Sequence, residues 1–287
     1  MQLSKDTNIL IVGLGLIGGS YAKALTKKGY TVTAITNDQA SVDYALQHGF
    51  IAKGSAFPDE QLVSEANLVV FALYPQVFLD WLKNYQHLFT PGTVLTDVTG
   101  VKGSVVYAAQ ELLREDVEFI AAHPMAGKEV SGVENSDETI FKNANYIVTP
   151  TNKNTPQAIA MCEQLGHELG FLRVSCLSPE QHDDMIGFLS QLTHCIAVSL
   201  MNCNETEGME AYTGDSFRDL TRIARINDKM WAELFMCNRD MLLKHMDAFA
   251  DTFAQFRQML YDSDVDGMRH AMRHSTARRA LFDKKKD

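Results

Sequence analysis

The residues best suited to chemistry near the start of the chain form a glycine-rich loop, Gly-Leu-Gly-Leu-Ile-Gly at positions 13–18. The loop directly follows an apolar run, Ile9 to Val12, and opens a stretch with helical spacing. In this pattern the first glycine permits a tight turn, the second lets the backbone approach a pyrophosphate, and the third lets helix and strand pack closely. Free N–H groups at the start of the helix then bind the phosphates. The predicted cofactor-binding residues of the loop are Gly13, Gly15, Leu16, Ile17 and Gly18.

The end of the second predicted strand is where such a site distinguishes NAD from NADP. There the chain reads Ala-Ile-Thr-Asn-Asp from Ala34 to Asp38. Thr36 occupies the position at which an acidic side chain usually binds the ribose hydroxyls, and no arginine follows to bind a 2′-phosphate. We therefore expect Thr36 at the ribose and NAD as the cofactor, with NADP left open. Asp38 either binds the ribose or caps the following helix.

Two further segments place reactive side chains after predicted strands: Thr-Asp-Val-Thr-Gly-Val-Lys at 96–102 and His-Pro-Met-Ala-Gly-Lys-Glu at 123–129. The carboxyl ends of parallel strands line the cofactor crevice of a doubly wound sheet, so both segments should face it. A histidine at a strand end, His123, titrates near neutral pH and can act as a general base. We expect Lys102 to be solvated, and His182-Asp183 to be a helix start with a structural role.

The elements that position these residues alternate along the first half of the chain. Short β-branched or aromatic runs bounded by Gly, Pro, Asn or Asp indicate buried parallel strands, and the segments between them have helical spacing. This alternation predicts βαβ units in an α/β doubly wound sheet of the Rossmann type. The predicted strands are 9–12, 31–35, 68–73, 93–98, 119–122, 146–148 and 171–174, and the predicted helices include 20–28, 41–48 and 156–169.

After Ser178-Pro179 the pattern changes to apolar residues three and four positions apart, with no convincing strand. We therefore predict two domains, a Rossmann-type domain at 1–178 and an all-α domain at 179–287. From Met185 to Met201 the predicted helix is apolar on nearly every side, which predicts that it is buried. A helix buried in this way in a short domain suggests a homodimer interface.

Composition excludes several classes of protein. The 287 residues carry a formal net charge of -10, which disfavours nucleic acid as a partner because phosphate binding needs a basic surface. No apolar run reaches the length of a membrane-spanning helix and no signal peptide opens the chain, so we expect a cytoplasmic protein with no membrane partner. The five cysteines form no Cys-x-x-Cys pair, so neither a metal site nor a disulfide framework is expected. The lysines Lys284, Lys285 and Lys286 should form a solvated tail.

Taken together, the glycine loop and four further strings resemble the prephenate and arogenate dehydrogenases of tyrosine biosynthesis over nearly the whole chain. The strings are Asp97–Lys102, His123–Glu129, Ser190–His194 and Phe217–Ala224. The combination of His-Pro-Met-Ala-Gly-x-Glu with Thr-Arg-Ile-Ala is fairly specific. The resemblance implies a Rossmann domain followed by a helical dimerisation domain, and hence a homodimer.

The resemblance also implies a reaction and the residues that carry it. Hydride would pass from a ring carbon of prephenate to NAD(P) while carbon dioxide leaves and the ring becomes aromatic, which gives 4-hydroxyphenylpyruvate. By likeness, His123 takes the hydroxyl proton and Arg222 pairs with a substrate carboxylate through its planar fork. His194 corresponds to a substrate-binding histidine of the helical domain, and Glu129 to an acidic residue that helps to close the site.

The chain departs from the family pattern at two places. Many relatives have Gly-Ser where this chain has Thr99-Gly100, and that serine hydroxyl would orient the histidine. We expect Thr99 to supply a catalytic hydroxyl one position earlier. Many relatives have Ser-His-Leu-Pro-His where this chain has Ser-Gln-Leu-Thr-His at 190–194, so Gln191 replaces the first histidine.

Three alternatives stay open. Arogenate as the preferred substrate differs from prephenate only in an amino group in place of the side-chain keto group. A β-hydroxyacid dehydrogenase shares the two-domain plan but relies on a lysine that the predicted helix from Met185 to Met201 lacks. A non-catalytic redox sensor that binds NAD(P) would need the glycine loop but not His123 and Arg222.

We expect no fused regulatory or chorismate mutase domain, because little sequence precedes the first strand or follows the last helix.

Overall fold

The computed structural model describes residues 2–283, so Lys284, Lys285 and Lys286, expected to form a solvated tail, lie outside the described residues. The chain forms two compact units, Met1–Arg239 and Asp240–Asp287. The second unit contains most of helix α11 (Arg239–Tyr261) and all of helix α12 (Val265–Arg279). All of the predicted site residues belong to the first unit.

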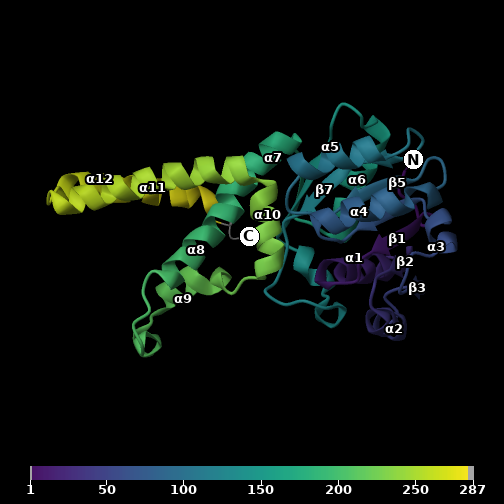
Figure 1. Ribbon diagram of the computed structural model, residues 1–287, viewed down its shortest axis with the longest axis horizontal. Coiled ribbons are helices and arrows are strands. Elements are labelled where there is room, and N and C mark those ends of the chain that lie inside the picture. Colours follow the sequence, from purple (N-terminus) through teal and green to yellow (C-terminus); the bar gives the residue numbers. More distant parts are fainter. Residues whose placement is uncertain (1, 284–287) are drawn as a thin grey trace. The chain divides into compact units, whose positions relative to one another are not determined.

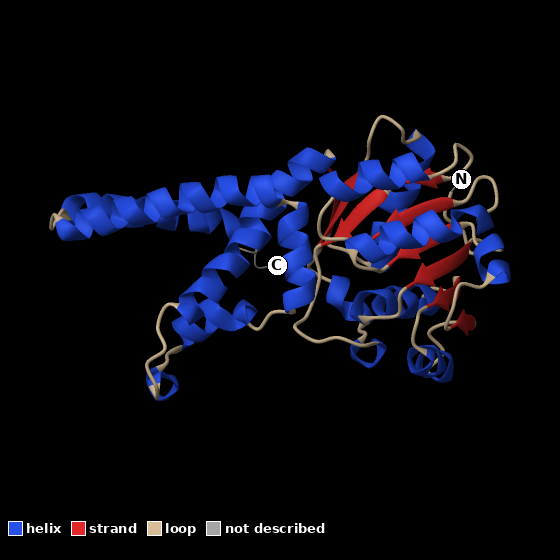
Figure 2. Ribbon diagram, viewed as in Figure 1, coloured by secondary structure: helices blue, strands red, loops and turns tan. Residues whose placement is uncertain are grey.

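A parallel six-stranded sheet in the order β3-β2-β1-β4-β5-β6 forms the centre of the first unit (Figures 1 and 2). This strand order is that of a dinucleotide-binding Rossmann fold, and it confirms the predicted fold class. The strands are β1 (Asn8–Val12), β2 (Thr31–Ile35), β3 (Lys53–Ser55), β4 (Leu68–Phe71), β5 (Val94–Asp97) and β6 (Glu118–Phe119). Strand β3 was not predicted, because Lys-Gly-Ser has none of the apolar character of a buried strand.

Helices cover both faces of this sheet, and successive strand residues point to opposite faces. In β1, Ile9 and Ile11 enter one core with α1 and α6, whereas Leu10 and Val12 enter the other with α4 and α5. The helices of this region are α1 (Leu16–Lys27), α2 (Gln39–Gln47), α3 (Glu60–Ser64), α4 (Pro75–Tyr85), α5 (Gly103–Leu112) and α6 (Pro156–Leu169).

A second sheet contains β7 (Ala121–Pro124), β8 (Asn145–Thr149) and β9 (Arg173–Cys176). Strands β7 and β8 are antiparallel, so the prediction of parallel strands was wrong for this pair. It was confirmed for β6, which pairs parallel with β5, and for β8 and β9, which pair parallel with each other. The chain leaves the main sheet after Ile120, whose N–H still donates to Leu95 of β5 at 2.9 Å. An apolar run shows that a strand is buried but not which strand lies beside it.

The described residues after Ser178 contain no strand, in line with the predicted change of pattern. Helix α7 begins in a capping box, in which Ser178 and Gln181 satisfy each other's backbone N–H groups. Helix α7 (Pro179–Ile186) is followed by a π-helical turn (Gly187–Leu192) and then, among other elements, by the helices α8 (Thr193–Asn202), α9 (Asp215–Thr221) and α10 (Asp228–Cys237).

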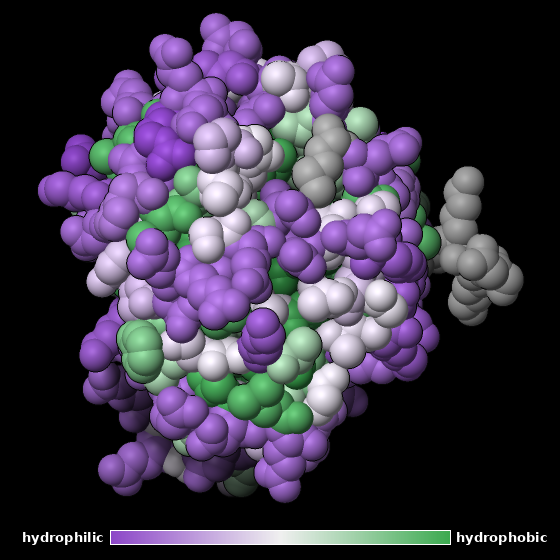
Figure 3. Space-filling model, turned by 90° about the vertical axis from the view of Figure 1, so that its right-hand side faces the viewer, coloured by the Kyte–Doolittle hydropathy of each residue, from purple (hydrophilic) through white to green (hydrophobic). Residues whose placement is uncertain are grey.

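The apolar helix predicted to be buried is in fact half exposed in the single chain. Met185, Phe188 and Leu189 have exposed fractions of 50%, 49% and 48%. A helix that is apolar on every side cannot turn all of its side chains toward one core. The face of the molecule in Figure 3 is, by contrast, mainly hydrophilic, with apolar side chains in small scattered groups.

The stretch Pro179–Asn202 corrects one further expectation. Its length and its mean hydropathy of 1.3 suffice for a helix to cross a membrane, although no run of that kind was expected. Core helices of water-soluble proteins have the same properties, so a single helix of this kind does not make a membrane protein.

Substitution of two glycines of the loop should separate the packing requirement from ligand binding. A Cβ at Gly18 would lie 1.9 Å from the Gly13 carbonyl oxygen, whereas nothing lies within 4 Å of a Cβ at Gly15. We expect Gly18→Ala to lower the free energy of unfolding by about 1–3 kcal/mol, and Gly15→Ala to change it much less. Thermal unfolding followed by circular dichroism measures both, and equal melting temperatures would contradict the expectation.

Candidate active site

The glycine loop lies between β1 and α1, at the carboxyl edge of the main sheet. Gly13 has a φ of 103°, and its N–H donates to the Ile35 carbonyl at 2.7 Å. Leu16 is buried and Ile17 is half-buried, so their side chains serve the core and leave only their backbone for a ligand. No side chain caps α1, although Asp38, Asp59 and Thr155 cap α2, α3 and α6. The N–H groups of α1 are therefore placed to receive an anion.

The end of β2 presents Thr36 and Asp38. The Thr36 N–H donates to the Ser55 carbonyl at 3.1 Å, and the residue is half-buried. Asp38 accepts from the N–H groups of Ala40 and Ser41 at 3.3 and 3.0 Å, so it caps α2. The hydrogen bond from the Ser41 hydroxyl is the main cause that lowers the pKa of Asp38. Of the two interpretations of Asp38, the structure therefore supports the helix cap.

His123 lies near the carboxyl end of β7, at the end of a chain of hydrogen-bonded side chains. Its Nδ1 is 2.8 Å from Nε2 of His182, and Nδ1 of His182 is 2.8 Å from Oδ1 of Asp183. Both partners belong to the middle of α7 and are buried. His182 and Asp183 had been assigned only a structural role as a helix start. The signal that could have revealed them is the His-Asp pair itself, because a carboxylate commonly orients an imidazole.

Lys102 is fully buried, so the expectation of a solvated lysine was wrong. Its Nζ donates to Oδ2 of Asp97 at 2.7 Å, to the hydroxyl of Thr99 at 3.2 Å and to the carbonyl of Ala122 at 2.6 Å. Burial lowers the pKa of Lys102, and the adjacent Asp97 opposes that shift. A lysine in this sequence context has no apolar pattern that would signal burial, and only the fold brings the carboxylate to it.

Thr99 does not contact His123 in the described part of the chain. Its hydroxyl bonds to the carboxylate of Asp97 and lies 2.9 Å from the carbonyl of Val101. The position that faces the imidazole is Gly100, because a Cβ built there would lie 3.8 Å from Nε2 of His123. The described residues therefore show no contact through which the Thr99 hydroxyl could orient His123.

Arg222 and Glu129 meet although they are far apart in sequence. Arg222, in the short helix Arg222–Ala224, donates from Nη1 to Oε1 of Glu129 in the loop after β7. Both side chains are partly exposed to solvent. The structure thus joins the two residues that were predicted to serve the substrate and to close the site.

His194 of α8 lies near this ion pair. Its Nδ1 donates to the Ser190 carbonyl at 2.8 Å, which leaves Nε2 as the other polar atom of the ring. The ring stacks on Trp231 with centroids 3.7 Å apart, a partner that the sequence analysis missed. Burial lowers the pKa of His194, while Glu129 raises it and Arg222 lowers it further. His194, Glu129 and Arg222 therefore share one neighbourhood.

Gln191 does not join this group. It is buried, donates to the Leu234 carbonyl at 2.9 Å and accepts from Asn238 at 2.7 Å. The residue that replaces a histidine of the relatives therefore connects the π-helical turn to α10 and its end.

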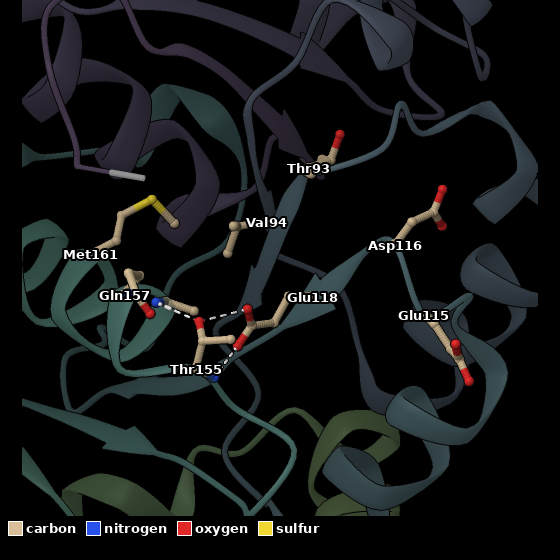
Figure 4. A pocket seen from close by; sticks show the side chains of 10 residues that line it. Thr93, Val94, Glu115, Asp116, Glu118, Thr155, Gln157 and Met161 are labelled. Atoms are coloured by element: carbon tan, nitrogen blue, oxygen red, sulfur yellow. Dashed lines mark hydrogen bonds between the residues drawn. The ribbon is translucent and has the colours of Figure 1, made fainter.

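A cavity of about 200 Å³ lies at the opposite edge of the main sheet, at the amino ends of β5 and β6 (Figure 4). Glu118 points into it and accepts from the N–H and hydroxyl of Thr155 at 2.6 and 2.8 Å. This carboxylate therefore supports the start of α6. Among residues 2–283, no three His, Cys, Asp or Glu side chains are grouped to hold a metal ion.

A Rossmann sheet, a glycine loop with an uncapped helix and a histidine at the end of a strand, hydrogen-bonded to a second histidine, are features of the two-domain nucleotide-dependent dehydrogenases. Residues 21–172 match the family described as prephenate dehydrogenase, nucleotide-binding domain. Residues 178–274 match prephenate dehydrogenase, dimerization domain.

Individual relatives agree with this match. The chain is 32% identical to a prephenate dehydrogenase of Bacillus subtilis over 93% of its own length and 74% of the relative's. It is 28% identical to a cyclohexadienyl dehydrogenase of Zymomonas mobilis over 96% of each chain. Its structure matches that of Aquifex aeolicus prephenate dehydrogenase in complex with hydroxyphenyl propionate and NAD+, with a TM-score of 0.89, 27% identity and coverage of 99% and 100%. The chain belongs to the prephenate dehydrogenase family, as its sequence strings had indicated.

Removal of the buried ammonium group should destabilise the protein strongly. Lys102→Met leaves the Asp97 carboxylate buried without its counter-charge, so we expect the free energy of unfolding to fall by about 3–5 kcal/mol. Lys128→Met is the matched control, because it breaks a partly exposed pair with Asp137 and should change the free energy by about 1 kcal/mol or less. Urea unfolding measures both, and similar midpoints for the two variants would contradict the prediction.

Proposed function

We propose that this protein is a prephenate dehydrogenase that oxidatively decarboxylates prephenate to 4-hydroxyphenylpyruvate with NAD as the acceptor, a step of tyrosine biosynthesis. The observation that carries the proposal is the position of His123, half-buried near the carboxyl end of β7 with its Nδ1 hydrogen-bonded to the buried His182. Membership of the prephenate dehydrogenase family supports the reaction.

The glycine loop fits a dinucleotide. The open space at Gly15 and the uncapped N-terminus of α1 suit a pyrophosphate, and Thr36 lies where the ribose hydroxyls would bind. When bound, the nicotinamide accepts the hydride from the substrate ring. The absence of an arginine directly after Asp38 favours NAD over NADP, and the NAD+ in the Aquifex structure agrees with this choice.

His123 is the proposed general base for the substrate hydroxyl. Burial lowers its pKa well below 6.5, and electrostatic interaction with His182 and with the Lys102 ammonium lowers it further. The imidazole is therefore neutral at neutral pH, with a nitrogen lone pair available for the proton. With Nδ1 bonded to His182, the nitrogen that can face the substrate is Nε2.

Arg222 is the proposed partner of a substrate carboxylate. In the absence of substrate Arg222 pairs with Glu129, so a bound carboxylate would replace Glu129 on the guanidinium. Glu129 would then be free to move with its loop and close the site. Nε2 of His194 is available to a polar group of the substrate, because Nδ1 is bonded to the backbone.

The proposed assembly is a cytoplasmic homodimer held together by residues 179–287, with the domain boundary at Ser178. The exposed apolar side chains of Met185, Phe188 and Leu189 offer a surface that a second copy could cover. The dimerization-domain family matched by residues 178–274 supports both the boundary and the dimer.

Loss of the proposed base should abolish turnover but not cofactor binding. We expect His123→Asn to lower kcat by about 10²-fold or more, with unchanged binding of NAD measured by calorimetry. Because the native imidazole has a pKa well below 6.5, kcat/KM should stay level as the pH falls through 6.5 and decline only at lower pH, where the base becomes protonated. Near-normal turnover of the variant would remove His123 from this role.

Loss of the proposed carboxylate partner should act mainly on substrate binding. We expect Arg222→Ala to raise KM more than it lowers kcat, because the guanidinium binds the carboxylate in both the ground state and the transition state. Steady-state kinetics give both constants, with Arg218→Ala as a control for the loss of a neighbouring surface arginine. A large fall in kcat at unchanged KM would count against the assignment.

A side-by-side spectrophotometric assay tests the whole proposal. Prephenate and arogenate are each supplied with NAD and with NADP, and formation of the reduced cofactor is followed. We expect the highest kcat/KM with prephenate and NAD. Higher kcat/KM with arogenate would assign the protein to that substrate, and tight cofactor binding without any turnover would favour a redox sensor.

A further inference from the structure

Two side chains that are linked to His123 by hydrogen bonds, an imidazole and a carboxylate, have no role in the proposed function so far. His182 and Asp183 are adjacent residues of α7, with exposed fractions of 0% and 6%. Two hydrogen bonds of 2.8 Å join Asp183 to His182 and His182 to His123. The ring centroids are 5.1 Å apart and the ring planes are inclined by 62°, so the two imidazoles are not stacked and meet at the hydrogen-bonded nitrogens.

The carboxylate of Asp183 is fixed as a hydrogen-bond acceptor by the backbone of α5. Its Oδ1 accepts from the N–H of Lys102 at 2.8 Å, and its Oδ2 from the N–H of Gly103 at 2.7 Å. Asp183 thus caps α5 from another helix, where the helix dipole favours its negative charge. A Cβ at Gly103 would lie 3.0 Å from Oδ2, so a glycine is what lets the carboxylate approach so closely.

This fixed acceptor determines the protonation of both imidazoles in turn. Since Asp183 accepts, Nδ1 of His182 must carry a hydrogen and donate it. In neutral His182 the other nitrogen, Nε2, is then a lone pair, and it must accept from Nδ1–H of His123. In neutral His123 this leaves Nε2 without a hydrogen. That nitrogen is the one on the side of Gly100.

We propose that His182 and Asp183 are positioning residues, which hold His123 in the tautomer whose Nε2 can accept the substrate hydroxyl proton. A polar side chain at position 100 could orient the histidine from the Nε2 side, but Gly100 has no side chain to do so. In this chain the orientation comes from the Nδ1 side. This assignment rests on the proposed role of His123 as the base.

The same chain of groups gives the proton a destination. The O–H bond of the substrate breaks and an Nε2–H bond forms on His123, and the Nδ1 proton of His123 can pass to Nε2 of His182. The resulting imidazolium of His182 is adjacent to the carboxylate of Asp183. The other charged groups that face His123 are Lys102 and Asp97, and Lys102 disfavours a positive charge that stays on His123.

The tautomer can be measured directly by nitrogen NMR of the native enzyme with 15N-labelled histidine. At neutral pH we expect the His123 signal, assigned by its loss in His123→Asn, to show a protonated Nδ1 and an unprotonated Nε2. A protonated Nε2 in the native enzyme would overturn the proposal. The NMR measurement of the tautomer does not depend on turnover, so it tests the positioning role independently of the proposed reaction.

Three variants test the positioning role. We expect His182→Leu to lower kcat by about 10²-fold or more, with KM nearly unchanged, because the acceptor for Nδ1–H is lost. His182→Gln places an amide oxygen near the former Nε2 and should restore much of that loss. Asp183→Asn keeps an amide oxygen that can accept from His182 and Lys102 but removes the negative charge, so kcat should fall because the imidazolium of His182 loses its counter-charge.

Stability controls separate positioning from folding. Asp59→Asn weakens the N-terminal cap of α3, in which the Leu62 N–H donates to Asp59 at 2.9 Å. The melting temperature of this variant should equal or exceed that of Asp183→Asn, and its kcat should equal that of the native enzyme. If His182→Leu does not fold, the comparison of native enzyme with His182→Gln and Asp183→Asn decides. A kcat within about twofold of native for His182→Leu or for Asp183→Asn would overturn the proposal.

Discussion

The carboxylate of Asp97 is buried at the carboxyl end of β5, where the backbone ladder of the main sheet stops. Its Oδ1 accepts from the Ala122 N–H at 3.1 Å, and its Oδ2 accepts from the Thr99 N–H at 3.0 Å and from Lys102 at 2.7 Å. A buried carboxylate is tolerated only when its oxygens are satisfied and its charge is balanced. The hydrogen-bond donors to Asp97 are supplied by the segment after β5 and by β7.

The arrangement of the active site follows from that constraint. Hydrogen bonds to Asp97 hold the turn that contains Lys102 in place, and this turn leads directly into the first turn of α5. The N–H groups at the start of α5 bind Asp183 and thereby place His182 beside His123. The Asp97 contact with Ala122 also fixes β7 one residue before the histidine. Two segments that are distant in sequence thus reach the same imidazole.

Polar contacts, and not an apolar core alone, join helices α7 to α10 around Asp183. Asn238, at the end of α10, donates to the Asp183 carbonyl at 2.9 Å and to Gln191 at 2.7 Å. These buried amides hold α7 and the π-helical turn against α10. The apolar side chains on the outer face of the same stretch, Met185 and Phe188 among them, are left for a partner subunit in the proposed homodimer.

Much of the fold and part of the site could be predicted from local sequence. Gly13, Gly15 and Gly18 indicated a dinucleotide site, because three glycines at this spacing between a strand and a helix form a local pattern of such sites. The doubly wound sheet, the change to helices after Ser178 and the family membership were likewise anticipated. The antiparallel pairing of β7 and β8 was not, because pairing depends on where the chain goes after a strand and not on the residues within it.

The sequence by itself therefore determined the fold class, the cofactor loop and the identity of the candidate base, His123. Only the tertiary structure decided which groups surround that base. It buried Lys102 against Asp97, turned Thr99 away from the imidazole, put Gly100 beside it and supplied His182 and Asp183 instead. The reason is physical: a backbone pattern acts between neighbours in sequence, whereas hydrogen bonds and charge pairs in a buried site act between residues brought together by packing.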